Sequence, residues 1–316
     1  MTQPISLALP SRPEDADAYE GHYAGLPTVE LDVAGERRPG EVAWRLSFWP
    51  EKDGLPTDLD SFFQQVATEE VRALVVSWNY DSSSRPIIER LAAEAHRLPA
   101  LRAIFLGAIP QEENEISWIN QSDLTPLLTA LPDLERLDVR GGSHLEISQV
   151  RHEKLRMFRV ESGGLRSGFV RGVASCEFPA LEHLELWLGV DEYNGDYAVD
   201  DFGPILTGDN LPALRHLGLQ DSDRQNDVAV AVATAPIVAR LDTLALSMGT
   251  LNDEGAEALL SGQPLTHLRR LDLHHHYLTD AMMARLGSAL ASVDLDLDDQ
   301  ETPDEEDGWM YTAVSE

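Results

Sequence analysis

The feature that most constrains the fold is a recurring string of apolar residues with the spacing L-x-x-L-x-L. Strict copies begin at Leu181, Leu214, Leu241 and Leu268. Related copies containing Ile, Val or Phe begin at Val71, Leu101, Leu134 and Leu155, and a degenerate copy at Leu290, Val293 and Leu295 is expected to close the series. Four strict copies exceed the roughly one that chance would give. The copies start 21 to 33 residues apart, a period typical of solenoid proteins.

Each copy predicts a strand that is followed by a turn and a helix. Several copies are preceded by L-P-x-L, where the proline ends one helix as the next strand begins. Helical patterns follow at residues 85–98, 122–131, 226–235, 252–262 and 279–290, and the expected N-cap residues are Ser122, Asn226, Asn252 and Thr279. One such unit cannot bury its apolar surface alone, so neighbouring units are expected to stack around a continuous core.

With these motifs the chain resembles the leucine-rich-repeat proteins, and among them the ribonuclease-inhibitor-like subclass, in a bacterial cytosolic type. Residues 241–260 and 268–286 carry the resemblance best, because Leu251 and Leu278 follow their strands and lead into helices. The resemblance implies an α/β solenoid, or horseshoe, with a parallel sheet on the concave face and helices on the convex face. The family's asparagine at the ninth repeat position is kept only at Asn79, which predicts a less regular horseshoe.

The repeats predict three parts in the chain. Residues 1–60 are expected to form an amino-terminal cap with strands at 29–33 and 42–48, and Leu59, Phe62, Phe63 and Val66 mark a first helix. An array of about eight or nine repeats is expected over 61–297. Residues 298–316 are predicted to form an acidic carboxy-terminal tail or cap.

The charge balance narrows the choice of partner. The chain has 55 acidic and 24 basic residues, a net charge of −31, which excludes nucleic acid and anionic membranes as partners of the whole protein. No stretch is long and apolar enough to span a membrane. The single Cys176 allows no intrachain disulfide, which fits the cytoplasm, and a core position suits it better than a role as nucleophile.

The concave face is the expected binding surface. Because side chains alternate along a strand, the third, fifth and seventh positions of each copy are expected to face it. The residues predicted to bind a partner there are Arg136, Asp138, Arg140, Arg159, Glu161, His183, Glu185, Trp187, His216, Gln220, Asp272 and His274. The alternative is a solvated face with cross-strand salt bridges. As an exposed anchor, Trp187 is expected to tolerate alanine without a change in melting temperature while partner capture weakens.

Two longer repeats add acidic and aromatic loops. Residues 107–123 contain Trp118, and residues 189–201 contain Tyr193 and Tyr197 together with five acids and no base. Acidic residues beside aromatic rings suit a basic protein partner. The alternative is that the loops are merely tolerated insertions.

Chemistry of other kinds has weaker support. Residues His274, His275 and His276, close to Asp272, could chelate a metal, but their spacing matches no zinc motif, and exposed turn histidines are the alternative; no metal or cofactor is predicted. The P-loop, G-x-G-x-x-G and G-x-S-x-G motifs are absent from the sequence. We therefore expect a non-catalytic protein-interaction module or scaffold. The alternative is a regulator of an enzyme, such as a GTPase activator, or a subunit of an enzyme complex.

Overall fold

The computed structural model describes residues 4–9, 21–31, 37–48, 58–79 and 81–315. Contacts divide the chain into two compact units, Met1–Glu161 and Ser162–Glu316, and each is described by itself. Residues 32 and 33 of the expected cap strand lie outside the described part. The expected boundaries of cap, array and tail stay predictions.

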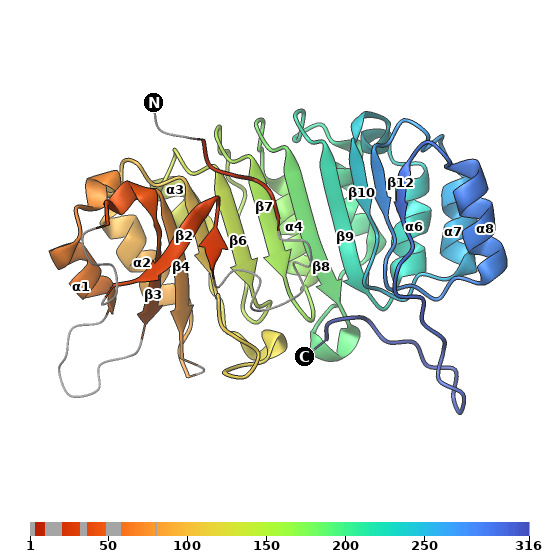
Figure 1. Ribbon diagram of the computed structural model, residues 1–316, viewed down its shortest axis with the longest axis horizontal. Coiled ribbons are helices and arrows are strands. Elements are labelled where there is room, and N and C mark those ends of the chain that lie inside the picture. The colour runs from red at the N-terminus through yellow and green to blue at the C-terminus, as the bar shows by residue number, and fades with distance from the viewer. Residues whose placement is uncertain (1–3, 10–20, 32–36, 49–57, 80, 316) are drawn as a thin grey trace. The chain divides into compact units, whose positions relative to one another are not determined.

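The first unit is built on parallel strands that neighbour one another in chain order (Figure 1). A short strand, β1 (His22–Tyr23), pairs antiparallel with β2 (Leu26–Glu30). The parallel series continues through β3 (Ala43–Phe48), β4 (Ala73–Trp78), β5 (Ala103–Leu106), β6 (Arg136–Arg140) and β7 (Met157–Glu161). Ala73, Ala103, Arg136 and Met157 are in register across this series. The predicted repeat register is therefore confirmed here, and it extends back to Ala43 in β3.

Helices of the first unit follow its strands, with one exception. They are α1 (Asp58–Gln65), α2 (Arg85–Ala93) and α3 (Thr125–Ala130), with short 3-10 helices η2 (Pro39–Glu41), η3 (Thr68–Glu70), η4 (Ala95–Arg97) and η5 (Ile116–Trp118). Between β6 and β7 the described chain has turns and bridges in place of a helix. The expected cap Ser122 is wrong: its hydroxyl contacts Ser84 Oγ at 2.9 Å, while the Asp123 carboxylate accepts from the Thr125 amide.

The second unit repeats the same arrangement. Its parallel strands are β8 (His183–Gly189), β9 (His216–Ser222), β10 (Thr243–Ala245), β11 (Arg270–Asp272) and β12 (Asp294–Asp296). Its helices are α4 (Ser167–Ser175), α5 (Gly203–Thr207), α6 (Gln225–Ala233), α7 (Asp253–Ser261) and α8 (Asp280–Ala289), with η6 (Asp191–Tyr193), η7 (Val199–Phe202) and η8 (Pro236–Arg240).

Two sequence expectations for the second unit need correction. The expected last copy places Val293 beside Leu271, but the residue in register with Leu271 is Leu295, two positions later. A shift of two residues keeps the same side chains on the same face of the strand, so the sequence pattern does not distinguish the two registers. Asn252 and Thr279 are N-caps as expected. Asn226 instead lies inside α6, where its side-chain amide donates to Asn252 Oδ1 of the next repeat at 2.9 Å.

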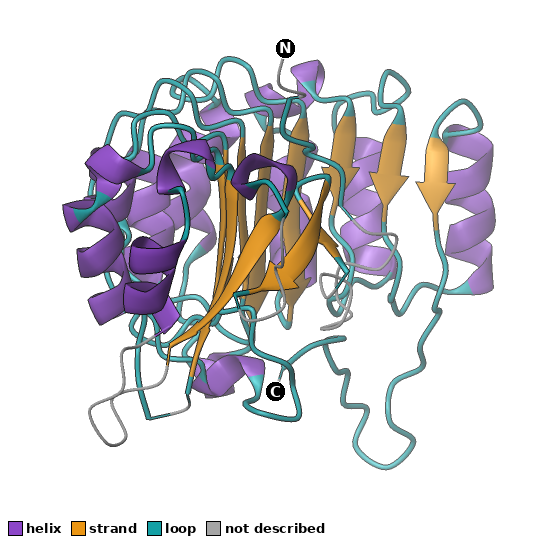
Figure 2. Ribbon diagram, turned by 60° about the vertical axis from the view of Figure 1, so that its left-hand side comes forward, coloured by secondary structure: helices purple, strands orange, loops and turns teal. Residues whose placement is uncertain are grey.

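Helices cover one face of the strands in each unit (Figure 2), and the repeat leucines, such as Leu184 and Leu217, are fully buried. Cys176 is also buried, as expected. Each unit is thus an α/β leucine-rich-repeat solenoid with a parallel sheet. We call the opposite face of the strands, which carries the third, fifth and seventh repeat positions, the helix-free face. Among the described residues, no helix combines the length and apolarity needed to cross a membrane.

The helix-free face of the first unit carries an apolar cluster of its own. Small and apolar side chains at the third and fifth repeat positions pack there with Ile5 and Tyr23; they include Ala43, Ala73, Val75, Ala103 and Phe105. The amino-terminal segment, residues 4–9, passes in front of β6 (Figure 1), and its Ile5 packs in this cluster. Strands β4 and β5 are therefore buried on both faces, which explains their apolar character on both.

Candidate functional site

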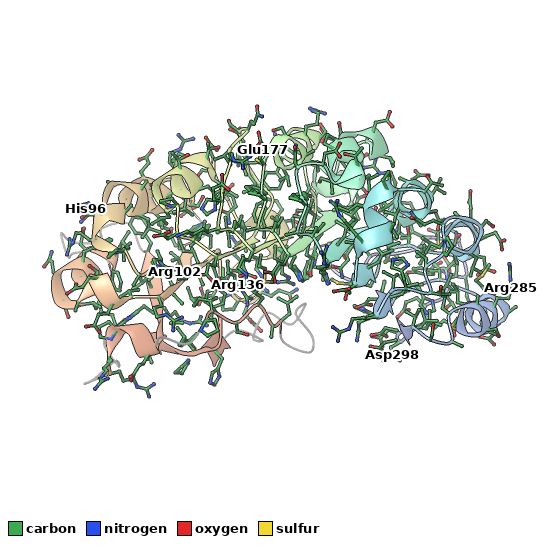
Figure 3. All side chains as sticks on the ribbon, turned by 90° about the horizontal axis from the view of Figure 1, so that it is seen from above. His96, Arg102, Arg136, Glu177, Arg285 and Asp298 are labelled. Atoms are coloured by element: carbon green, nitrogen blue, oxygen red, sulfur yellow. The ribbon has the colours of Figure 1, made fainter. Side chains whose placement is uncertain are left out.

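The charged residues predicted on the helix-free face of the first unit are buried and paired with one another. Arg136 Nε lies 2.6 Å from Asp138 Oδ2, and the Tyr23 hydroxyl donates to the same oxygen at 2.9 Å. Arg136, labelled in Figure 3, also donates from Nη1 to the Ser6 carbonyl at 3.0 Å and to the Ala8 carbonyl at 3.2 Å. This pair therefore holds the amino-terminal segment against the strands.

A second buried group joins two arginines to one carboxylate. Arg140 Nε lies 2.5 Å from Glu161 Oε2, and Arg159 donates to Glu161 Oε1. The Arg140 guanidinium also lies over the Phe105 ring, 5.8 Å from its centroid. These charges serve contacts within the first unit, and their predicted contact with a partner stays a prediction.

In the second unit, two predicted histidines and a glutamate meet on the helix-free face. The register of β8 and β9 places His183 beside His216, and their rings stack with centroids 3.7 Å apart and planes 7° apart. Glu185 Oε2 lies 3.2 Å from His183 Nε2 and 3.7 Å from His216 Nε2. The carboxylate is buried, whereas the His183 and His216 side chains are 12% and 22% exposed. We call these three residues the His–Glu–His cluster.

Neighbouring residues hold the glutamate in place. The Trp187 indole N–H donates to Glu185 Oε1 at 3.0 Å. Gly218 lies opposite Glu185 in the register, and a Cβ there would stand 2.6 Å from Gln220 Oε1 and 2.9 Å from Glu185 Cγ. A glycine is therefore needed for this close approach. Gln220, another predicted residue, is buried and donates to Ser247 Oγ at 2.7 Å.

Trp187 is not the exposed anchor that the sequence suggested. Only 1% of the residue is exposed, so that expectation is wrong. A buried indole needs an acceptor for its N–H, and Glu185 two residues earlier on the same strand provides one. The alternation of side chains along a strand predicts the face of the sheet on which a side chain lies, but not whether that side chain is exposed to solvent.

Two further predicted residues, Asp272 at the end of β11 and His274 just after it, belong to a separate ionic group. His274 Nδ1 lies 2.7 Å from Asp272 Oδ1, and Arg270 lies 2.5 Å from Asp296 Oδ2 and 3.3 Å from Asp272 Oδ2. His276 is fully buried, its Nδ1 accepts from the Leu278 amide, and burial lowers its pKa. His274 and His276 thus contact different partners, and His276 is not the exposed turn histidine that was the alternative.

The aromatic residues of the two long loops differ in exposure. Trp118, in η5 of the first unit, is 63% exposed. In the second unit Tyr193 is half-buried, and Tyr197 is buried with its hydroxyl bonded to Ser222 Oγ. The Arg224 guanidinium lies 4.1 Å from the Tyr197 ring centroid, and burial raises the pKa of Tyr197 to about 12. Tyr197 therefore anchors its loop.

The carboxy-terminal segment is fixed along one edge of the second unit. Three of its backbone amides donate hydrogen bonds to this unit. The Tyr311 amide donates to Tyr277 Oη at 2.8 Å, and the Ala313 amide donates to the Met248 carbonyl at 2.7 Å. The Val314 amide donates to Asp221 Oδ1 at 3.0 Å. Trp309 and Tyr311 are nevertheless 56% and 60% exposed, with ring centroids 6.4 Å apart. Exposed acids lie in the same segment and in the 189–201 loop. We call residues 304–311 of the carboxy-terminal segment the acidic edge; its exposed residues are Asp304, Glu305, Glu306, Asp307, Trp309 and Tyr311.

Asp221 makes the attachment of this segment depend on pH. Its residue is fully buried, and burial raises the pKa of its carboxyl well above the ordinary value. The folded chain therefore keeps a proton that the unfolded chain releases above about pH 4, so stability falls as pH rises from there through the folded-state pKa. We expect Asp221→Asn, which keeps the acceptor for Val314 and tolerates the positive φ of 56°, to raise the melting temperature.

Thermal unfolding of both proteins between about pH 5 and pH 8 measures this effect. The advantage of Asp221→Asn is expected to grow with pH, since only the wild-type carboxyl must lose its proton. A difference that stays constant over this range, or a variant less stable at every pH, would contradict the assignment.

Comparison with solved structures supports the fold. A Bacteroides fragilis protein superposes with a TM-score of 0.77 and 28% identity, over 90% of this chain and 80% of that one. An internalin from Listeria monocytogenes gives a TM-score of 0.35 and 16% identity, over 72% of this chain and 54% of its own. The TLR13–ssRNA13 complex gives a TM-score of 0.40 and 17% identity, over 82% of this chain and 36% of its own. These two weak similarities carry no argument about function. No protein-family model and no curated protein matches the sequence.

Proposed function

We propose that the protein is a non-catalytic, cytoplasmic interaction module that binds a basic segment of a partner protein at the acidic edge of its second unit. The observation that carries the proposal is the display of Trp309 and Tyr311, which are more than half exposed although the backbone beside them is bonded to Tyr277 and Met248. Exposed aromatic rings on a fixed segment are typical of interface anchors.

The chemistry of the acidic edge favours cationic side chains. A guanidinium or ammonium group is attracted to the face of Trp and Tyr rings. The carboxylates of 304–307, all exposed, would pair with further cations along the same segment. Because the hydrogen bonds to Met248 and Asp221 already order the backbone, binding costs less conformational entropy than it would for a free tail.

We further infer that the helix-free face of the second unit contributes to binding. Four of the predicted residues retain partial exposure there and can be reached by a partner: His183, His216, Asp272 and His274. The buried charges of the first unit would add to binding only if the amino-terminal segment were displaced from Arg136.

A titration with a defined peptide tests the acidic edge. The probe is a synthetic peptide of alternating arginine and glycine, and its affinity is measured by fluorescence anisotropy at physiological salt. Trp309→Ala is expected to weaken binding about tenfold, which corresponds to the loss of one anchor residue. The same peptide with glutamate in place of arginine is expected not to bind.

Trp118→Ala separates the acidic edge from the 107–123 loop, the other segment predicted to bind a basic partner, because Trp118 is 63% exposed but belongs to the first unit. Its affinity for the peptide is expected to equal that of the wild type. If Trp309→Ala and Trp118→Ala bind the peptide equally well at every salt concentration, the net charge of −31 alone retains it, and the proposed site is rejected.

A further inference from the structure

We propose that the His–Glu–His cluster is a binding site for one divalent transition-metal ion of the zinc type. Two imidazoles and one carboxylate are a donor set that zinc accepts. The three ligand atoms of His183, Glu185 and His216 lie within 4.8 Å of one another. The inference is independent of the function proposed for the acidic edge.

The spacing of the ligand atoms suits a tetrahedral ion. With bonds of about 2.0–2.1 Å, two ligands of one zinc ion stand about 3.3 Å apart. Glu185 Oε2 is 3.2 Å from His183 Nε2 and 3.7 Å from His216 Nε2, so shifts of a few tenths of an ångström suffice for these two edges. An imidazole binds a metal in its own plane, so the stacked rings must rotate apart, and their partial exposure leaves room for this rotation.

The surroundings hold the carboxylate as a metal site requires. Trp187 donates to Oε1 of Glu185, which leaves Oε2 directed at the two histidines. Such outer hydrogen bonds orient ligands and tune their affinity. All three ligands stand on neighbouring, hydrogen-bonded strands, and Gly218 leaves the space that the Glu185 side chain fills.

Three protein ligands leave the fourth position of a tetrahedral ion open. The two histidines are partly exposed, so water or a side chain from a partner can reach this position. The site would therefore bind zinc more weakly than a closed set of four ligands, and a partner that supplies the fourth ligand would strengthen it.

A second cluster of similar composition, in which an arginine already pairs with the carboxylates, is not expected to bind a metal ion. Asp272, His274 and Asp296 also bring three ligand atoms within 4.8 Å of one another. Here, however, the Arg270 guanidinium already contacts both carboxylates, at 3.3 Å and 2.5 Å. A cation of the chain thus occupies the place that a metal would take, and the cluster provides an internal control.

Titration of the full chain with zinc chloride in a calorimeter, together with the visible absorption of Co²⁺ as a spectroscopic substitute, tests the proposal. We expect one ion per chain and a Co²⁺ spectrum typical of tetrahedral coordination. His183→Ala and His216→Ala are each expected to weaken zinc binding more than about 100-fold, since loss of a ligand exceeds the 10–100-fold effect of outer-shell changes. Gly218→Ala, whose Cβ would press on both Gln220 Oε1 and Glu185 Cγ, is expected to weaken zinc binding about tenfold.

His274→Ala is the control and is expected to keep the stoichiometry and the affinity of the wild type. Circular dichroism without metal checks that each variant is folded, and a variant that does not fold is replaced by the glutamine substitution at the same position. Absence of zinc binding in the wild type overturns the proposal, and so does binding that survives His216→Ala or disappears in His274→Ala.

Discussion

Replacing Asp138 by alanine is expected to lower the free energy of unfolding by about 3–5 kcal/mol, the usual result of breaking a buried ion pair from one side. The substitution leaves the Arg136 guanidinium buried without its carboxylate and removes the acceptor of the Tyr23 hydroxyl. Because Arg136 also binds the Ser6 and Ala8 carbonyls, the amino-terminal segment is expected to detach more easily. Urea unfolding measures the loss of stability, and hydrogen exchange at residues 4–9 measures the detachment.

The matched control is Glu153→Ala, which breaks an ion pair of similar length, 2.6 Å, between exposed side chains of Arg151 and Glu153. Exposed pairs contribute about 0–1 kcal/mol, so this variant is expected to unfold almost as the wild type does. Equal losses in the two variants would show that Asp138 carries no special role in holding the segment.

Trp187→Ala is expected to cost about 3–5 kcal/mol, because truncating a large buried aromatic residue removes apolar burial and leaves a cavity. The residue is 1% exposed, and its N–H bond to Glu185 is lost as well. The effect is measured as a shift of the urea midpoint at unchanged slope. This expectation is the opposite of the one that follows from an exposed Trp187.

Trp309→Ala provides the comparison, since the Trp309 ring is 56% exposed. Substitutions at such positions usually change stability by no more than about 0.5 kcal/mol. A Trp187 variant that is as stable as Trp309→Ala and yet loses a binding partner would restore the interpretation of Trp187 as an interface anchor.

The repeat register could be predicted because it depends on local chemistry. Leucines such as Leu217 and Leu244 must face the helices, and this requirement fixes which residues stand side by side on neighbouring strands. The register of the last copy was predicted wrongly because Val293, Leu295 and Leu297 occupy alternate positions. Two registers therefore bury the same kind of side chain.

The burial of the predicted charged residues could not be read from the same pattern. For Arg136 it involves residues 4–9, whose contact with Arg136 spans 130 positions of the chain. One signal was available: Ala73, Ala103 and Phe105 are apolar at positions that point away from the helices, and strands that are apolar on both sides are usually covered on both.

For the His–Glu–His cluster, the sequence could predict that the two histidines lie side by side. It could not predict the distances between their ring nitrogens and the Glu185 carboxylate. His183 and His216 occupy the same position in successive copies, so a parallel register brings them together. The three histidines at 274–276 are neighbours along the chain, whereas in a solenoid the neighbours in space are those of the next repeat.

The cover of residues 4–9 over the first unit also bears on how the chain emerges during synthesis. At about 5–20 residues per second, the 130 residues between Ser6 and Arg136 take roughly 6 to 26 seconds to produce. During that interval the Arg136–Asp138 ion pair, which holds residues 4–9 over the first unit, is absent from the apolar face around Ala73 and Phe105. Until Arg136 is made, the hydrogen bonds that hold Ser6 and Ala8 cannot form, so the amino-terminal segment has only its apolar contacts to keep it in place.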